Sequence, residues 1–403
     1  MKRLLFIAHR VPFPPDKGER VRAFHEIGAL SRHFQVTVAA LSHNRDDVAA
    51  VAGLRELCHK VIVAPSAGAM GLIRGGISLL IGRSVTEEYF HSRRLREMII
   101  SEARREPFDL VMCYSSSTLP FGLAVSAPVR VIDLVDIDSA KWSGYSASAR
   151  WPKSLLYRHE AAAVGRLERR AVERCDAALL VSEAESAAMG PVGSKVITVA
   201  NGVDVDFFRP DAVAPADLGP ASLVFTGTMD YRPNVEAVCW FVREVWPETK
   251  RRIPELTFTI VGRNPTRPVR RLAKIPGLNV TGSVPDVRGY LAAAGVVICP
   301  LQMARGIQNK VLEAMAMGKA VVASPAALEG LDVETGKDLL QADTPDEWRR
   351  YILELLADGE LRDRLGRSAR VCVESKYNWT KRMEPLVSLC LRLIRSKEEG
   401  FAR

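Results

Sequence analysis

Short runs of apolar residues recur along the chain and are separated by stretches in which apolar residues have helical spacing. The runs are residues 4–8, 35–41, 60–64, 108–114, 129–135, 177–182 and 195–200, and then 222–227, 256–262, 278–282, 296–301, 320–324 and 338–342. Nearly continuous apolar strands that alternate with helices are typical of parallel sheets covered on both faces. The pattern therefore predicts an α/β protein.

The pattern also restarts once, which indicates two domains. Between the two sets of runs lies NGVDVDFFRPDAVAPADLGP, residues 201–220, which is rich in Pro and Asp and resembles a connection. A chain of 403 residues is long for a single core. We expect Rossmann-like domains over residues 1–200 and 201–376, with a cleft between them.

The segment GIQNKVLEAMAMGKAVV, residues 306–322, predicts a strand-turn-helix unit. Residues 308–317 favour a helix that Gly318 ends, and the next strand follows directly. Lys310 and Glu313 then lie in the first turns of a helix that follows a strand and a glycine. In α/β proteins such positions bind phosphates and riboses. The alternative is a plain surface ion pair between two residues three apart.

Composition and charge narrow the class of protein. Hydrophobic residues make up 47% of the chain, and no stretch reaches the roughly 20 apolar residues of a membrane span. The seven scattered cysteines predict reduced core residues of a cytoplasmic protein. The net charge of +9 divides into +6 over residues 1–200 and +3 over the rest. A basic surface favours anionic lipid or a phosphorylated substrate, whereas no motif indicates nucleic acid.

With both halves laid out, the chain resembles the GT-B glycosyltransferases of family 4, retaining enzymes that use nucleotide-sugar donors. The resemblance rests on NGVDVDFFRP, FTGTMDYRPN and GIQNKVLEAMAMGKAVV, and on the first strand with its Gly18 loop. Three stretches, VIDLVDIDSAKW, GTMDYRPN and RGIQNKVLEAMAMGK, also resemble a subgroup associated with bacterial exopolysaccharide and exosortase (PEP-CTERM) gene clusters. In this fold the last helix, here residues 377–403, returns to the first domain.

The resemblance implies a donor site on the second domain. Glu313 matches the family's ribose-binding glutamate, whereas the other glutamate of that motif is replaced by Arg305. Thr228 and Asn234 stand near positions where relatives hold cations. We therefore expect Arg305 and Lys310, with the amides of Gly306 and Ile307, to neutralise the diphosphate. The predicted donor-binding residues are Gly18, Arg232, Arg305, Gly306, Ile307, Lys310 and Glu313.

On the first domain, Asp136 and Asp138 are the predicted catalytic residues. Both follow a strand, where a carboxylate can accept the acceptor's proton or stabilise positive charge on the sugar. Asp-x-Asp also spells a metal-binding motif of the other main glycosyltransferase fold, but the two-domain pattern argues against it. A further alternative is that Asp138 only caps the helix expected from about Ser139.

The resemblance implies a metal-independent, retaining hexosyltransferase without a cofactor, acting on a lipid-linked or saccharide acceptor. We expect it in the cytoplasm, weakly bound to the anionic inner face of the cytoplasmic membrane. That expectation rests on the basic N-terminal half, a helix over residues 90–105 and the apolar residues 70–81. The alternatives are a GT-B nucleotide-sugar epimerase and a catalytically silent GT-B binding protein.

Overall fold

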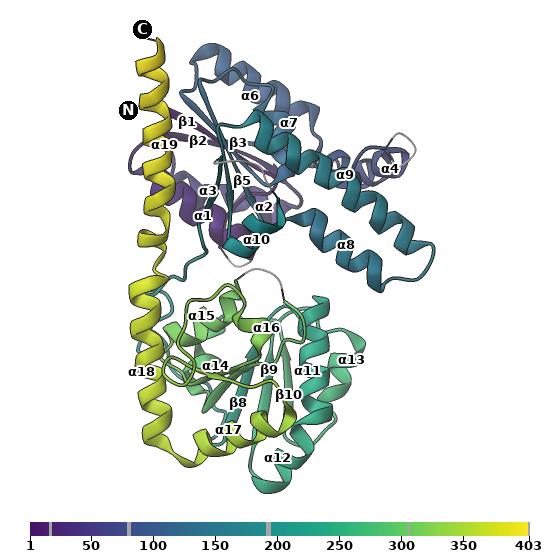
Figure 1. Ribbon diagram of the computed structural model, residues 1–403, viewed down its shortest axis with the longest axis vertical. Coiled ribbons are helices and arrows are strands. Elements are labelled where there is room, and N and C mark those ends of the chain that lie inside the picture. Colours follow the sequence, from purple (N-terminus) through teal and green to yellow (C-terminus); the bar gives the residue numbers. More distant parts are fainter. Residues whose placement is uncertain (16–17, 79–81, 191–194, 305–306, 402–403) are drawn as a thin grey trace. The chain divides into compact units, whose positions relative to one another are not determined.

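The computed structural model describes residues 1–15, 18–78, 82–190, 195–304 and 307–401 (Figure 1). The chain forms two compact units. The first comprises Met1–Ala200 together with Met383–Arg403, and the second comprises Asn201–Arg382. Of the helices that the structure describes, none combines the length and the apolar character that a membrane crossing requires.

The first unit is built on a parallel sheet, as its apolar runs predict. In the described residues the strand order is β3-β2-β1-β4-β5-β6-β7. The strands are β1 (Arg3–Ala8), β2 (Gln35–Ser42), β3 (Lys60–Pro65), β4 (Leu110–Tyr114), β5 (Val129–Val135), β6 (Ala177–Leu180) and β7 (Val196–Thr198). Strand order reverses between β1 and β4. From β1 the chain adds β2 and β3 on one side, and it then continues from β4 to β7 on the other side. Ligands of open α/β sheets bind beyond the carboxyl ends of the strands at such a reversal.

Helices pack on this sheet and bury it. They are α1 (Gly18–Ser31), α2 (Arg45–Ala49), α3 (Val51–Arg55), α4 (Gly68–Ser78), α5 (Val85–Phe90), α6 (Arg93–Arg105), α7 (Leu119–Gly122), α8 (Asp138–Ser148), α9 (Lys153–Arg174) and α10 (Glu183–Ala188). The helix α19 (Trp379–Phe401) crosses the unit boundary, and its residues from Met383 onward belong to the first unit.

The second unit repeats the design. Its described strands are parallel and lie in the order β10-β9-β8-β11-β12-β13, so the reversal falls between β8 and β11. They are β8 (Ser222–Thr226), β9 (Thr257–Val261), β10 (Leu278–Gly282), β11 (Val296–Cys299), β12 (Val321–Ala323) and β13 (Leu340–Gln341). The helices are α11 (Arg232–Glu244), α12 (Trp246–Arg252), α13 (Arg267–Leu272), α14 (Arg288–Ala293), α15 (Asn309–Ala316), α16 (Pro325–Leu328), α17 (Pro345–Ala357) and α18 (Gly359–Lys376).

The helix expected over residues 90–105 is α6, which begins at Arg93. Phe90 ends α5, and the chain is extended at His91 and Ser92 before α6 begins. Ser92 caps α6, because its side chain accepts a hydrogen bond from the Leu95 amide at 3.3 Å. Leu95 and Ile99 are both fully buried in the core of the first unit. The apolar face of α6 is therefore not available to a membrane, contrary to the basis of that expectation.

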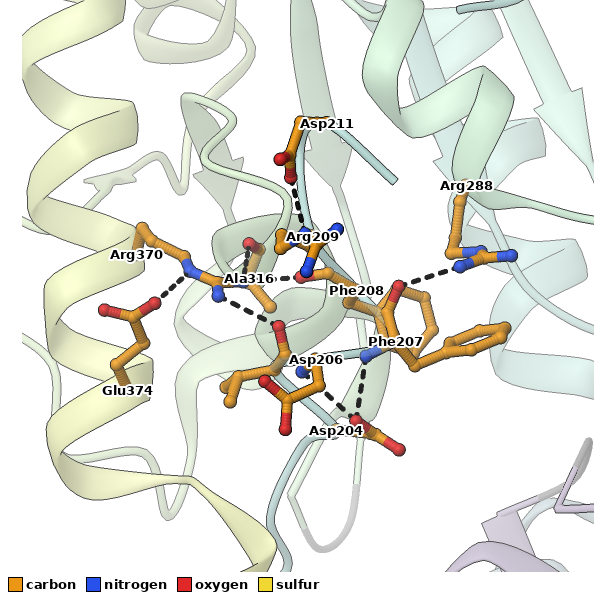
Figure 2. A network of polar contacts seen from close by, with 11 residues as sticks. Asp204, Asp206, Phe207, Phe208, Arg209, Asp211, Arg288, Ala316, Arg370 and Glu374 are labelled. Atoms are coloured by element: carbon orange, nitrogen blue, oxygen red, sulfur yellow. Dashed lines mark hydrogen bonds and ion pairs between the residues drawn. The ribbon is translucent and has the colours of Figure 1, made fainter. Parts of the chain in front are cut away.

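The start of the second unit is fixed by an arginine of α18 (Figure 2). The Arg370 guanidinium donates to the backbone oxygens of Phe208 and Ala316, both at 2.6 Å, and of Val205 at 2.9 Å. Its Nε donates to Glu374 at 2.5 Å. Ala316 is the last residue of α15, so one side chain holds together the NGVDVDFFRP segment, α15 and α18.

Two further contacts order the same segment (Figure 2). The Asp204 carboxylate accepts from the amides of Asp206 at 3.2 Å and Phe207 at 2.9 Å, which closes a tight turn. Arg288 stacks on the Phe207 ring at 3.8 Å and donates to its carbonyl oxygen at 2.9 Å. The acidic and aromatic residues of the motif thus have a structural role within the second unit.

Replacing Arg370 with alanine should lower the free energy of unfolding by about 3 kcal/mol, because three backbone oxygens lose a charged donor. Urea denaturation followed by tryptophan fluorescence measures the change. Arg367, exposed on the same helix, is the matched control, and Arg367→Ala should shift stability by about 0.5 kcal/mol or less. Equal effects of the two substitutions would contradict this role of Arg370.

Candidate functional site

The strand reversal of the second unit brings together side chains from two helices. Lys310 lies in the first turn of α15, which follows β11, and Asn234 lies in the first turn of α11, which follows β8. The Lys310 ammonium donates to the side-chain oxygen of Asn234 and lies 4.8 Å from the centre of the Phe225 ring. The Asn234 side-chain nitrogen donates in turn to the Thr228 carbonyl oxygen at 2.9 Å. Asn234 is only 4% exposed, so it holds the ammonium in a fixed position.

Two glycines permit this close packing. A Cβ at Gly227, directly after β8, would lie 2.7 Å from the Asn234 side-chain nitrogen and 3.3 Å from the Lys310 ammonium. A Cβ at Gly262, directly after β9, would lie 1.7 Å from the Gly227 carbonyl oxygen. The carboxyl edge of the sheet therefore has bare backbone beside a positive charge, and this arrangement suits an anionic ligand.

Glu313 lies one turn further along α15 than Lys310, and the two side chains form no ion pair among the described residues. Burial raises the pKa of Glu313 to about 7, and the nearby Lys310 charge only partly opposes this shift. Burial likewise lowers the pKa of Lys310. The surface ion pair considered from the sequence is thus wrong. Both groups are half-buried, and each would gain from a ligand that stabilises its charged form.

The other predicted donor-binding residues do not all lie beside Lys310 and Glu313. Ile307 is buried just before α15, and Gly18 is the first residue of α1 in the first unit. Arg232 begins α11, but its guanidinium pairs with Glu236 at 2.6 Å and its side chain is half exposed. Arg305 and Gly306 lie outside the described residues.

In the first unit, the two predicted catalytic carboxylates share one lysine. The Lys141 ammonium donates to Asp136 at 2.8 Å and to Asp138 at 3.2 Å. Burial alone would lower the pKa of Lys141, but the charges of the two aspartates more than offset it and the pKa is raised. Among the described side chains, no group of three or more His, Cys, Asp or Glu is arranged to hold a metal ion.

A strained turn presents Asp136 at the end of β5. Val135 has a φ of 68°, which is unfavourable for a β-branched residue, and the Asp136 amide donates to the Leu134 carbonyl oxygen at 2.9 Å. The Asp133 carboxylate holds this turn, because it accepts from the Val135 amide at 2.8 Å. Asp133 is itself fully buried and pairs with Arg22 at 2.5 Å. Backbone strain that the surroundings enforce is common at functional sites.

The helix-cap alternative for Asp138 is wrong. The N-cap of α8 is Ile137, and Asp138 is the first helical residue. The Ile137 amide donates to Glu185 at 2.7 Å, and the Ser139 amide donates to Glu168 at 3.1 Å. Carboxylates from α9 and α10 therefore satisfy the start of α8, and the Asp138 carboxylate faces Lys141 instead.

Other polar residues of the first unit lie at the strand reversal and were not singled out from the sequence. His9 directly follows β1 and Ser115 directly follows β4, the two strands that flank the reversal. Ser115 has a φ of 76°, and the His9 ring stacks on Tyr114 with centroids 6.0 Å apart. His43 follows β2, and its ring nitrogen lies 3.2 Å from the His9 carbonyl oxygen. Each of these residues closely follows a predicted strand, and this position could have marked them as candidates from the sequence.

Comparison with known proteins agrees with this architecture. The family model described as "Glycosyl transferases group 1" matches residues 220–358, which lie within the second unit. An uncharacterized glycosyltransferase of Methanocaldococcus jannaschii is 32% identical over 125 residues, a match that spans 29% of this chain and 31% of that protein.

Solved structures resemble the chain over nearly its whole length. Sucrose-phosphate synthase from Thermosynechococcus elongatus has a TM-score of 0.69 at 14% identity, with 100% of both chains covered. Anabaena HepE, in complex with UDP and glucose, has a TM-score of 0.64 at 15% identity, with 96% of this chain and 99% of HepE covered. The chain therefore has the GT-B fold, with two Rossmann-like parallel-sheet domains, and the predicted fold class is confirmed.

Proposed function

We propose that the protein is a retaining glycosyltransferase that takes a sugar from a nucleoside diphosphate bound at the strand reversal of the second unit. The observation that carries the proposal is the Lys310 ammonium, held by Asn234 at that reversal, with Glu313 one helical turn away. A glycosyltransferase match over residues 220–358 supports the same reading.

The chemistry of the donor explains why an ammonium and a carboxylate lie one helical turn apart. When the bond from sugar to phosphate breaks, negative charge develops on the departing diphosphate, and a fixed ammonium stabilises it more than the ground state. Lys310 supplies that charge, while the Glu313 carboxylate accepts hydrogen bonds from the ribose hydroxyls. Arg305, with the amides of Gly306 and Ile307, remains the further phosphate contact that the sequence predicts.

Asp136 and Asp138 are the acceptor-side groups in this proposal. With one ammonium between two carboxylates, the Asp136–Lys141–Asp138 cluster carries a net charge of −1. That charge can stabilise the positive charge that develops on the sugar or accept the proton of the acceptor hydroxyl. The strained turn at Val135 holds the cluster at the carboxyl edge of the sheet.

We further propose a lipid-linked or saccharide acceptor in exopolysaccharide synthesis, met at the inner face of the cytoplasmic membrane. The basic excess over residues 1–200 and the resemblance of VIDLVDIDSAKW to the exopolysaccharide subgroup support this. A neighbour of the same fold, WaaG, is described as involved in lipopolysaccharide biosynthesis; it has a TM-score of 0.67 at 15% identity, with 96% of this chain and 99% of WaaG covered.

Incubation of the purified chain with a panel of nucleotide sugars tests the proposal. The true donor should raise the thermal stability by mass action, by about 2.7 kcal/mol at a concentration 100 times its Kd. Nucleoside diphosphate should be released when acceptor is present, and the rate should persist in excess chelator. Conversion of the donor without acceptor would instead identify an epimerase. Binding without turnover would identify a silent protein, and activity restored only by manganese would contradict metal independence.

A further inference from the structure

The turn between α8 and α9 exposes large apolar side chains. Figure 1 shows the two helices side by side, joined at their end by a short turn. Trp151 in this turn is 77% exposed, and Leu155 and Leu156 in the first turn of α9 are 46% and 39% exposed. A cluster of one tryptophan and two leucines on the surface is typical of a site that binds an apolar or interfacial partner. We call Arg150 to Arg158 the α8–α9 tip.

The exposed charged side chains of the tip itself are all positive. Arg150, Lys153 and Arg158 are exposed, and none of them forms an ion pair among the described residues. The sequence from residue 139 to residue 159 contains no Asp or Glu at all. Elsewhere on the surface, exposed arginines are often paired, as Arg93 is with Glu97 at 2.8 Å. The partner of the tip should therefore be negatively charged as well as apolar.

Aromatic rings and one hydrogen bond join α8 and α9 behind the tip. The Trp142 ring of α8 lies 5.5 Å from the Tyr157 ring of α9 and 5.9 Å from that of Tyr145. The Ser146 hydroxyl also donates to the Ser154 carbonyl oxygen across the turn at 3.0 Å. A surface that is already ordered loses little conformational freedom on binding.

We propose that the α8–α9 tip is a docking surface for an anionic lipid bilayer. Trp151, Leu155 and Leu156 enter the boundary between headgroups and acyl chains, where tryptophan is favoured. The three basic side chains contact lipid phosphates. The adjacent aliphatic pair favours lipid over single-stranded nucleic acid, which needs flat stacking surfaces along a basic groove. This inference names the membrane contact of the proposed function but depends on neither its donor nor its acceptor.

Co-sedimentation of the full chain with vesicles tests this surface without any sugar donor. Binding to mixed phosphatidylglycerol and phosphatidylcholine vesicles should exceed binding to phosphatidylcholine alone and should fall as salt is raised. The Trp151→Ser, Leu155→Ser double variant should bind at least tenfold more weakly. Each of Arg150→Gln, Lys153→Gln and Arg158→Gln should cost about fivefold.

The matched control removes the same number of positive charges from another surface of the first unit. Arg94, Arg96 and Arg104 are exposed on α6. Their combined change to glutamine should alter vesicle binding far less than a triple variant of the tip that combines Arg150→Gln, Lys153→Gln and Arg158→Gln. Thermal unfolding would check that every variant is folded. Tip variants that bind vesicles as the wild type does, or equal binding to neutral vesicles, would overturn the proposal. A dimer in sedimentation velocity that the Trp151→Ser, Leu155→Ser change abolishes would assign the tip to a second copy of the chain instead.

Discussion

Replacing Lys310 with alanine is expected to lower kcat about 100-fold, the effect of losing one preorganised group that stabilises transition-state charge. The ammonium is held by Asn234 at the strand reversal, so it is in position before the donor binds. Burial lowers its pKa, and an arriving diphosphate would stabilise the charged form. The effect should therefore appear in kcat at saturating donor, measured as nucleoside diphosphate released.

Lys319 provides the control for this substitution. It is also half-buried in the second unit, its pKa is also lowered by burial, and its ammonium donates to the Ala292 carbonyl oxygen at 2.8 Å. It precedes β12, however, and so lies at the amino edge of the sheet. Lys319→Ala should lower stability and leave kcat nearly unchanged. A Lys310→Ala variant that keeps kcat within about twofold of the wild type would contradict the phosphate role.

Replacing Glu313 with glutamine is expected to weaken donor binding by about 2 kcal/mol, or roughly 30-fold, at pH 8. The variant loses a carboxylate that accepts from the ribose hydroxyls. The loss should depend on pH, because the pKa of Glu313 is about 7 in the free protein. Hydrogen bonds from the ribose stabilise the carboxylate, so binding below pH 7 releases a proton and the affinity falls as the pH is lowered.

Comparing the wild type with Glu313→Gln at two pH values isolates this group. The ratio of their Kd values should shrink about tenfold between pH 8 and pH 6, since the wild type is then mostly protonated at Glu313. Titration of the donor's own phosphates cancels in the ratio. A ratio that does not change with pH would mean that the Glu313 carboxylate does not contact the ligand.

Much of the fold is predictable because burial on both faces of a sheet produces nearly continuous apolar strands. The run at residues 129–135 coincides with β5, and the helix expected over residues 308–317 is α15, one residue shorter at each end. The helix expected over residues 90–105 begins three residues later, at Arg93. Ser92 caps a new helix there, and its residue type was the overlooked signal.

The candidate site is only partly predictable. Lys310 and Glu313 stand out by their place in a strand-turn-helix unit, but the contact of Lys310 with Asn234 joins residues 76 apart and depends on which strands are neighbours. The sequence marked Asn234 only as standing near a position that relatives give to a cation. The structure brings the Lys310 ammonium to that side chain. The expectation that Lys310 helps to neutralise the diphosphate stays a prediction.

Asp138 shows the limit of judging a residue by its type. An aspartate at the start of a helix is a good cap candidate, but Glu168 and Glu185 already hold the α8 amides from other helices. Lys141 was overlooked as the partner of Asp136 and Asp138, although its helical spacing from Asp138 permits an ion pair. Tertiary partners therefore decided the capping of α8, whereas the Lys141 pair is local.

Calorimetric titration of the full chain with uridine, guanosine and adenosine diphosphates tests the central claim most directly. One of these ligands should bind at a single site, and the Lys310→Ala, Glu313→Gln double variant should lose at least 100-fold in affinity. The control is Lys337→Ala with Glu334→Gln, an exposed ion pair of the same spacing at 2.7 Å in the same unit. It should bind as the wild type does. Undiminished binding by the Lys310 and Glu313 variant would contradict a nucleotide site at the start of α15.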